Sequence, residues 1–119
     1  MQTSFQIKKS TIPNAGKGLF AKKSLPKGAE LRVLGTLIKR NSIADHCTRY
    51  ADAYKFRVGI YLLIPMGWEG MINHSETPNM VKVIKGTALS LRTLRPIHSG
   101  EELFHCYSRY AQNRFYKNR

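Results

Sequence analysis

The sequence predicts a mostly β fold built from short strands, and three observations lead to this prediction. Apolar and polar residues alternate over short stretches along much of the chain, which is typical of half-buried strands. Glycine, proline and asparagine separate these stretches at short intervals, as at the turns of small sheets. Only the segment 41–54 carries apolar residues at helical spacing.

The strands expected before that segment are separated by turn residues. Phe5 and Ile7 alternate with polar neighbours, and a loop rich in glycine, proline and asparagine follows at 13–18. A second turn is expected at 25–28, where proline presets φ and glycine accepts positive φ. The strands predicted in this part are 5–7, 19–21, 31–34 and 36–39.

The segment 41–54 is predicted as the one helix. Asn41 or Ser42 can act as its N-cap. Its apolar residues fall at i, i+4, i+7 and i+11, so they form one stripe that we expect to face the core: Ile43, Cys47, Tyr50 and Tyr54.

The second half of the chain again predicts strands. Lys85-Gly86 and Ser99-Gly100 are expected as turns between them. The predicted strands are 60–64, 80–84, 88–91 and 101–107. The whole chain, 1–119, is expected to be a single domain, and its basic and aromatic end, 108–119, is expected to be a tail or a flap.

The composition limits the partners and the compartment. Twenty Lys and Arg against seven Asp and Glu give a net charge of +13, which fits contact with nucleic acid as well as a surface kept basic for solubility. Residues 1–10 contain no apolar leader, and the apolar run 60–66 is too short to span a bilayer. We therefore expect a soluble intracellular protein.

The cysteines and histidines do not predict a metal site. Cys47 and Cys106 are expected to be buried thiols rather than a disulfide. Each follows a histidine, but neighbouring residues on a strand point to opposite faces, so His105 and Cys106 are not expected to bind one ion. Neither cysteine has a second one at the short spacing of zinc motifs.

Two polar segments are candidates for a ligand site. Gly16-Lys17-Gly18 lacks the third glycine of a dinucleotide fingerprint, and it is either a plain turn or a place where the backbone closely approaches a ligand. The heptad 73–79, which begins Asn73-His74, is longer than a turn requires. It is either a capped surface loop or a buried polar site completed by a ligand.

Three segments, taken together and in this order, resemble the signature blocks of the SET domain family: residues 16–21, residues 73–79 and residues 100–107. The spacing is similar to that of the compact viral members. The resemblance implies small curved β-sheets with a C-terminal pseudoknot, an exception to the usual rule against threading. It also implies a protein lysine methyltransferase that uses S-adenosylmethionine, with a histone tail as the default protein substrate by family analogy.

By the same resemblance, individual residues receive roles. The residues implied to bind S-adenosylmethionine are Gly16, Lys17, Gly18, Asn73, His74 and Tyr107. Tyr107 also orients the substrate amine, and Tyr54 lines the lysine channel. His105 stands where the family usually has an aromatic or aliphatic residue that limits methyl number, so it either makes the channel pH-sensitive or only packs.

Other functions stay open at this point. A cysteine-rich zinc segment found after the domain in many family members is missing from this sequence, so channel closure falls to the tail, to the substrate or to a second subunit in a homodimer. One alternative is a catalytically silent SET-like module that binds a peptide. The other is a small basic protein that binds nucleic acid and is indifferent to S-adenosylmethionine.

Overall fold

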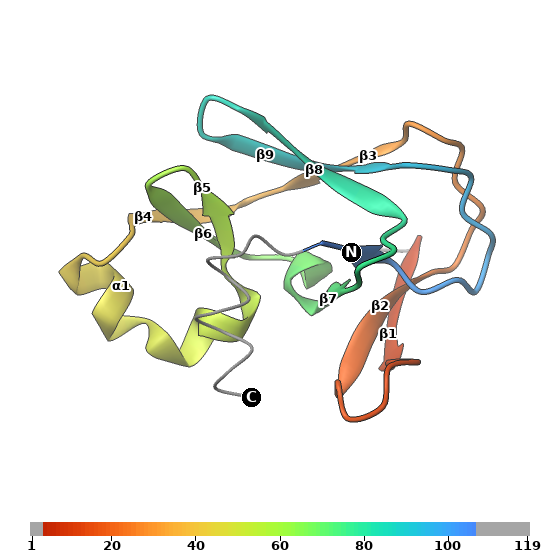
Figure 1. Cartoon of the computed structure of the whole chain (residues 1–119), viewed down its shortest axis with the longest axis horizontal. Coiled ribbons are helices and arrows are strands. Elements are labelled where there is room, and N and C mark those ends of the chain that lie inside the picture. The colour runs from red at the N-terminus through yellow and green to blue at the C-terminus, as the bar shows by residue number, and fades with distance from the viewer. Residues whose placement is uncertain (1–3, 107–119) are drawn as a thin grey trace.

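The computed structural model describes residues 4–106, and the predicted mostly β class is confirmed (Figure 1). Strands are short, and the helical segments lie between β4 and β5 and between β6 and β7. In chain order the elements are β1 (Phe5–Lys9), β2 (Lys17–Ala21), β3 (Glu30–Val33), β4 (Gly35–Lys39), α1 (Ile43–Cys47), the 3-10 helix η1 (Arg49–Tyr54), β5 (Phe56–Val58), β6 (Tyr61–Pro65), the 3-10 helix η2 (Trp68–Met71), β7 (Asn73–His74), β8 (Met80–Lys85), β9 (Ala88–Thr93) and β10 (Phe104–His105).

The described strands form several small sheets instead of one large one. β3, β9 and β8 make an antiparallel sheet in that order, and β4, β6 and β5 make another. β1 and β2 form a separate hairpin, which lies below the first of these sheets in Figure 1. The β8–β9 turn is at Gly86, as predicted, and its φ of 62° is in the left-handed region that glycine adopts without strain.

The pairing that brings the chain's second half together is between β7 and β10. These strands run parallel, with Phe104 opposite Asn73 and His105 opposite His74. Asn79 fixes the same segment, because its side-chain amide donates to the Glu102 carbonyl at 2.8 Å and its oxygen accepts from the Phe104 amide at 2.8 Å. The end of the described chain therefore lies beside the loop that begins at Asn73.

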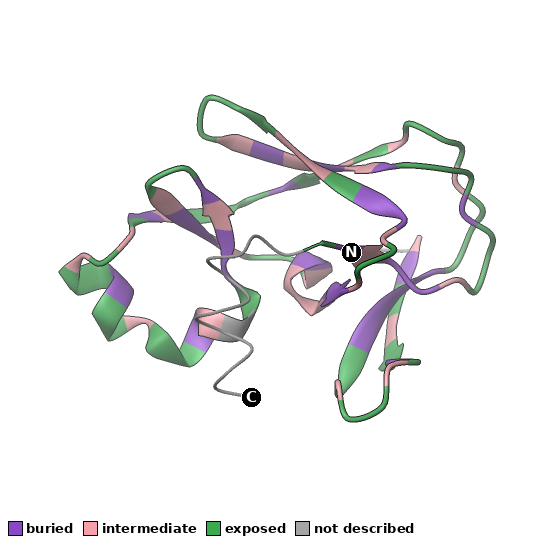
Figure 2. Ribbon diagram, viewed as in Figure 1, coloured by how far each residue is buried: buried purple, intermediate pink, exposed green. Residues whose placement is uncertain are grey.

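One apolar cluster joins the sheets. Its members come from three of the four sheets and from the segments next to β7 and β10, and Figure 2 marks buried stretches on the ribbons of these sheets. The largest side chains with almost no exposure include Leu62, Leu89, Leu91 and Leu103. Because each small sheet has only one apolar face, no sheet can bury its core residues without the others.

Among the described residues the structure confirms one α-helix, inside the predicted segment 41–54, but its length and its buried side differ from the prediction. The segment divides into α1 and η1, and the stripe expected to be buried is largely exposed, with 82% of Ile43 and 84% of Tyr50 accessible. The buried side of this segment is instead a polar cluster, in which the Lys55 Nζ lies 2.9 Å from Asp45 and 2.6 Å from Asp52. Ser42 is the N-cap, and its hydroxyl accepts from the Asp45 amide.

Strand boundaries in the second half also differ from the prediction. The segment expected as a strand over 101–107 contains only the two residues of β10, preceded by an isolated bridge between Glu102 and Phe20. β5 was not predicted. It forms a tight hairpin with β6, and the turn between them contains Gly59, whose φ of 64° is in the left-handed region. The two-residue strand β7 is also too short to leave a periodic pattern.

The cysteines differ from the expectation of buried thiols. Cys47, at the end of α1, and Cys106, just after β10, are both exposed, and they form no disulfide with each other. The reason is that the α1 stripe faces solvent and that β10 ends at His105. None of the described helices is both long and apolar enough to cross a membrane.

Candidate functional site

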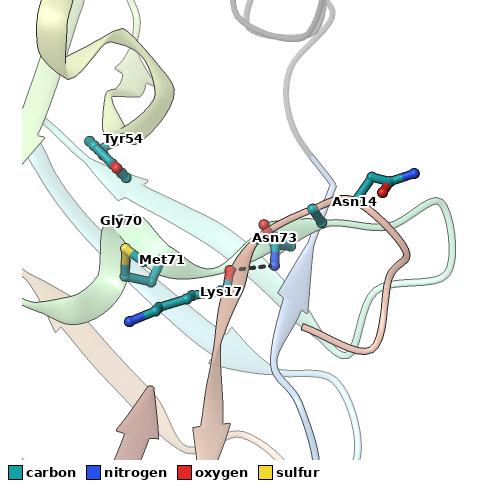
Figure 3. Close-up of a pocket in the computed structure, with 8 residues that line it drawn as sticks. Asn14, Lys17, Tyr54, Gly70, Met71 and Asn73 are labelled. Atoms are coloured by element: carbon teal, nitrogen blue, oxygen red, sulfur yellow. Dashed lines mark hydrogen bonds between the residues drawn. The ribbon is translucent and has the colours of Figure 1, made fainter. Parts of the chain in front are cut away.

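A cavity of about 460 Å³ lies where the loop between β1 and β2, the end of η1 and the segment before β7 meet. Figure 3 shows Tyr54 reaching it from η1 and Asn14 bordering it from the β1–β2 loop. The residues that line it are Asn14, Ala15, Gly16, Lys17, Tyr54, Gly70, Met71 and Asn73. Of the predicted site residues, the structure thus brings Gly16, Lys17, Tyr54 and Asn73 to one cavity.

The β1–β2 loop presents backbone to this cavity. Asn14 has φ of 65° and Gly16 has φ of 75°, so both adopt the left-handed conformation. The Ser10 amide donates to the Gly16 carbonyl at 2.8 Å and closes the loop at its base. A Cβ at Gly16 would meet no atom within 4 Å, which leaves the backbone there open to a ligand.

Asn73 connects this loop to the centre of the molecule. It is buried, and its side-chain amide donates to the Lys17 carbonyl at 3.0 Å, the bond drawn in Figure 3. The same amide donates to a carboxylate oxygen of Glu102 at 3.2 Å. Two acceptors on different segments therefore fix its orientation at the wall of the cavity.

Glu102 is the residue on which these contacts converge. Its buried carboxylate accepts from the Ser10 hydroxyl at 2.8 Å and from the Thr11 amide and hydroxyl at 2.8 Å and 2.6 Å. Together with the bond from Asn73, these hydrogen bonds satisfy both oxygens of a charge that would otherwise be costly to bury. Sequence reasoning placed Glu102 in a motif but gave it no part in the site.

Gly18 lies against this carboxylate instead of lining the cavity. It is buried, and a Cβ added there would lie 2.2 Å from a Glu102 oxygen and 3.1 Å from the Asn73 amide nitrogen. No side chain fits that space. The two glycines of the Gly16-Lys17-Gly18 sequence therefore serve different needs: Gly16 gives the loop its backbone conformation, and Gly18 makes room for Glu102.

Gly70 and Tyr54 form the boundary between two hollows. A Cβ at Gly70 would lie 3.0 Å from both Pro65 and the Tyr54 side chain, so the missing side chain lets Tyr54 pack closely. A neighbouring apolar hollow of about 360 Å³ shares Tyr54, Gly70 and Met71 with the first cavity and also borders on Trp68. Sequence reasoning missed Gly70 and Met71, and their only signal is their position three and two residues before Asn73.

The histidines of the predicted site lie away from the cavity. His74 is buried, and its Nε2 lies 3.0 Å from a carboxylate oxygen of Glu76. His105 is 5% exposed and stacks on Phe56 with ring centroids 5.3 Å apart. Burial, and then the charges of Lys82 and His74, lower the pKa of His105 to about 3. Tyr107 lies outside the described residues.

The arrangement can hold a ligand of nucleoside size. The volume of the cavity falls within the range of small-molecule sites, which is roughly 300–1,000 Å³. Its wall combines open backbone at Gly16, a fixed amide at Asn73 and an aromatic ring at Tyr54. Such a wall offers hydrogen-bonding groups together with a π face that tolerates a cation.

Comparisons with known proteins bear on this site. The SET domain family model matches residues 16–108, which include the whole cavity lining except Asn14 and Ala15. A segment of 37 residues is 49% identical to the protein-lysine N-methyltransferase SMYD4 of Gallus gallus; it makes up 31% of this chain and 5% of that protein.

Solved structures share the fold. A Polycomb Repressive Complex 2 chain of an autoinhibited ctPRC2 bound to S-adenosylmethionine superposes with a TM-score of 0.77 at 20% identity, over 97% of this chain and 17% of that chain. A candidate histone methyltransferase of Plasmodium falciparum superposes with a TM-score of 0.68 at 22% identity, over 92% of this chain and 96% of that chain. This chain therefore spans a small part of some relatives and nearly all of another.

Proposed function

This chain belongs to the SET domain family, and from that premise we propose that it transfers a methyl group from S-adenosylmethionine to a lysine side chain of a protein. The observation that carries the proposal is the cavity bordered by Gly16, Lys17, Tyr54 and Asn73, which come from three separate segments. The similarity to a protein-lysine N-methyltransferase supports the same reaction, although it extends over a short stretch.

The residues present fit S-adenosylmethionine. A Cβ at Gly16 would meet nothing within 4 Å, so a ligand can approach the loop backbone there. The cavity of about 460 Å³ is of suitable size for a nucleoside with an amino-acid arm. Gly16, Lys17 and Asn73 would hold the ligand, and the Tyr54 ring would border it. When bound, S-adenosylmethionine supplies a methyl group activated by a positively charged sulfur.

The chain's own contribution is to place the reactants. An in-line displacement depends on alignment, and rigid groups provide it better than mobile ones. Asn73 is held by the Lys17 carbonyl and the Glu102 carboxylate, and Glu102 is held by Ser10 and Thr11. The wall of the cavity is therefore built before any ligand arrives.

The substrate lysine must react as the neutral amine. A free lysine has a pKa of about 10.4, so presenting the amine at neutral pH costs roughly 4–5 kcal/mol. A channel that removes water from the ammonium lowers this pKa. We propose that Tyr54 provides an aromatic wall for this channel, because 43% of it is exposed at the boundary between the two hollows.

Two further roles are part of the proposal. Tyr107 would accept a hydrogen bond from the amine and direct its lone pair, as the family resemblance implies. His105 would act as a neutral packing group and not as a pH switch, because its pKa is lowered to about 3 and its ring stacks on Phe56. A neutral imidazole adds no positive charge near the site at physiological pH.

The substrate class we propose is histone tails, by analogy with the family. The net charge of +13 repels a basic tail, so nucleic acid beside the tail would relieve this repulsion. We therefore propose nucleosomes as the substrate form, which would place the chain inside the cell. Closure of the channel by a second subunit in a homodimer, or by residues 108–119, belongs to the same proposal.

Transfer of radiolabelled methyl from S-adenosylmethionine to core histones and nucleosomes tests the function. We expect the wild type to incorporate label, and Asn73→Ala and Tyr107→Phe to lose at least about a hundredfold in rate, the scale of one missing positioning or electrostatic group. Calorimetric titration with S-adenosylmethionine separates the variants, since Asn73→Ala should lose affinity.

Tyr54→Ala and Tyr61→Ala provide a matched pair for the channel. Both remove one aromatic ring, but Tyr61 lies on β6 and borders neither hollow. We expect Tyr54→Ala, which removes the aromatic wall, to lower the rate or change the number of methyl groups added, and Tyr61→Ala to bind S-adenosylmethionine and transfer methyl as the wild type does. Absence of labelling with every histone substrate, together with no measurable binding of S-adenosylmethionine, would refute the proposed function.

A further inference from the structure

Three side chains with metal-binding atoms come together on the side of β7 and β10 where the described chain ends. The ligand atoms of His74, Glu76 and Cys106 all lie within 4.8 Å of one another, the one such group in the part of the chain that the structure describes. Two of them, His74 Nε2 and a Glu76 oxygen, are already 3.0 Å apart. We propose that these residues form a zinc-binding site.

The backbone around the three residues is well fixed. β7 and β10 pair in parallel with His105 opposite His74, and the Ser75 amide donates to the His105 carbonyl at 3.1 Å. The Ser75 hydroxyl accepts from the Thr77 amide at 3.0 Å and shapes the turn that carries Glu76. Sequence positions 74, 76 and 106 are therefore brought together by the pairing of two strands and a tight turn.

The donor set suits zinc better than other common ions. Imidazole nitrogen, carboxylate oxygen and thiolate sulfur are all accepted by Zn²⁺, whereas Mg²⁺ and Ca²⁺ prefer oxygen alone. Zinc bonds of about 2.0–2.3 Å place tetrahedral ligands roughly 3.3–3.8 Å apart. The ligand atoms lie within 4.8 Å of one another, and because Glu76 and Cys106 are exposed, rotation of their side chains would bring the atoms to this spacing on zinc binding.

Protons balance simply in the binding step. The Cys106 thiol gives its proton to solvent and binds as thiolate, and neutral His74 offers one ring nitrogen. Water completes the fourth position, as in zinc sites with three protein ligands. Binding would join the loop after β7 to the segment that leads to Tyr107, and it does not depend on the proposed methyl transfer.

The sequence predicted no metal, because His105 and Cys106 are adjacent on a strand and point to opposite faces, and because neither cysteine has a second one at the spacing of zinc motifs. That reasoning correctly separates His105 from Cys106, since His105 is buried against Phe56 while Cys106 is exposed. The partner of Cys106 is instead the histidine on the paired strand, together with an acidic residue two positions later.

Titration with cobalt chloride in the presence of a phosphine reductant tests the site. Co²⁺ replaces Zn²⁺ in such sites and gives a thiolate-to-cobalt absorption band in the near ultraviolet. We expect the band to reach saturation at one equivalent and to disappear on addition of zinc chloride. Competition with a chromophoric chelator then gives the zinc affinity, which should fall more than about tenfold in Glu76→Gln and Cys106→Ser.

Cys47→Ser is the matched control, because it removes the other exposed cysteine at the far end of α1. It should keep the absorption band and the rise in melting temperature that zinc produces by binding the folded chain. Cys106→Ser should lose both, with its melting temperature in the absence of metal showing that it is folded. The site is refuted if the wild type gives no band, or if Cys47→Ser loses the band while Cys106→Ser keeps it.

Discussion

The carboxylate of Glu102 accepts four hydrogen bonds in the interior, three from Ser10 and Thr11 and one from Asn73. One residue near the end of the described chain thus fixes the loop near its beginning. Hydrogen bonds to a buried charge are stronger than neutral ones, and removing the acceptor leaves the donors without partners. The backbone of the proposed cofactor site consequently depends on a residue that lies outside the cavity.

We expect Glu102→Ala to lower the free energy of unfolding by about 3 kcal/mol or more, because buried donors lose their acceptor. Urea denaturation measures this loss. Glu101→Ala is the control, because its carboxylate pairs with the exposed Arg95. It also accepts from the His98 amide and, at 3.4 Å, from the Asn79 side chain, so we expect a loss of about 1 kcal/mol, smaller than at Glu102. Equal losses for the two neighbours would show that Glu102 has no special part in holding the loop.

His105 makes a prediction about pH. Its folded-state pKa of about 3 lies below the usual 6.5, so between these values the unfolded chain binds a proton that the folded chain does not. The contribution of His105 to the free energy of unfolding is therefore fully present above the unfolded-state pKa. It falls as the pH drops below that value, by roughly 1.4 kcal/mol per pH unit. The loss continues until about pH 3, where the folded chain also takes up the proton.

His105→Phe, which keeps a ring against Phe56, should remove this part of the pH dependence. Between pH 7 and pH 4 the variant should lose about 3 kcal/mol less stability than the wild type, measured by urea denaturation at both pH values. His98→Ala removes an exposed histidine and should leave the wild-type slope unchanged. A wild-type slope in His105→Phe would contradict the burial of a neutral imidazole.

At the scale of elements, the hairpin of β1 and β2 shows how much a single glycine decides. Gly18 on β2 has no room for a Cβ because a Glu102 oxygen would lie 2.2 Å away. Gly28 has φ of 86° but open space around it. The first position is limited by packing and the second by backbone conformation, so substitution separates the two costs.

Gly18→Ala should destabilise the fold by about 3 kcal/mol, since overpacking adds to displacement of a buried carboxylate. Gly28→Ala should lower the free energy of unfolding by about 1 kcal/mol, because an L-residue is strained at positive φ. Melting temperatures should therefore drop further for Gly18→Ala, and this variant alone should lose affinity for S-adenosylmethionine. A larger loss at Gly28 would mean that the loop adapts to a side chain at Gly18.

The segment 41–54 shows where sequence patterns fail at this scale. Apolar spacing predicted a buried stripe, yet the interior of this segment is polar, with Lys55 held between Asp45 and Asp52. Single-sequence periodicity assigns charged residues to solvent, and a buried ion pair inverts that assignment.

The strands bounded by glycine were predictable, because turns and alternation are local features of the sequence. β7 and β10 were not predictable, because their two-residue parallel pairing is set by residues far apart in the chain.

For the whole molecule, part of the cavity lining was predictable from the sequence, but the arrangement of the residues in space was not. Gly16, Lys17, Tyr54 and Asn73 line it, while His74 takes part in a different cluster. The sequence alone does not show which of the adjacent residues Asn73 and His74 points toward the cavity. Strand alternation sends their side chains to opposite faces only once the pairing with β10 is formed.

The charge of +13 is unevenly distributed over the fold. Residues 4–29, which include the β1–β2 hairpin, contain six lysines and no acidic residue. By contrast, Arg92 on β9 lies 3.5 Å from Glu30, and Arg95 pairs with Glu101. The β3–β9–β8 sheet also carries Arg32, Lys82 and Lys85, but an acidic residue lies among its basic ones. The hairpin end has no acidic residue, so we expect it to be the more attractive surface for a polyanion.

This distribution predicts how the chain contacts nucleic acid. Binding of a DNA duplex, followed by fluorescence anisotropy, should weaken with salt along a log–log slope of about −0.9 for each phosphate neutralised. The triple variant Lys9→Gln, Lys22→Gln, Lys23→Gln should reduce the slope by two to three, since all three lysines are exposed and each contact counts about 0.9.

Arg92→Gln, which removes a paired charge, is the control and should change the slope by less than about one. An unchanged slope in the triple variant would place the nucleic-acid contact elsewhere, and a wild type that binds no DNA at low salt would leave solubility as the role of the basic surface.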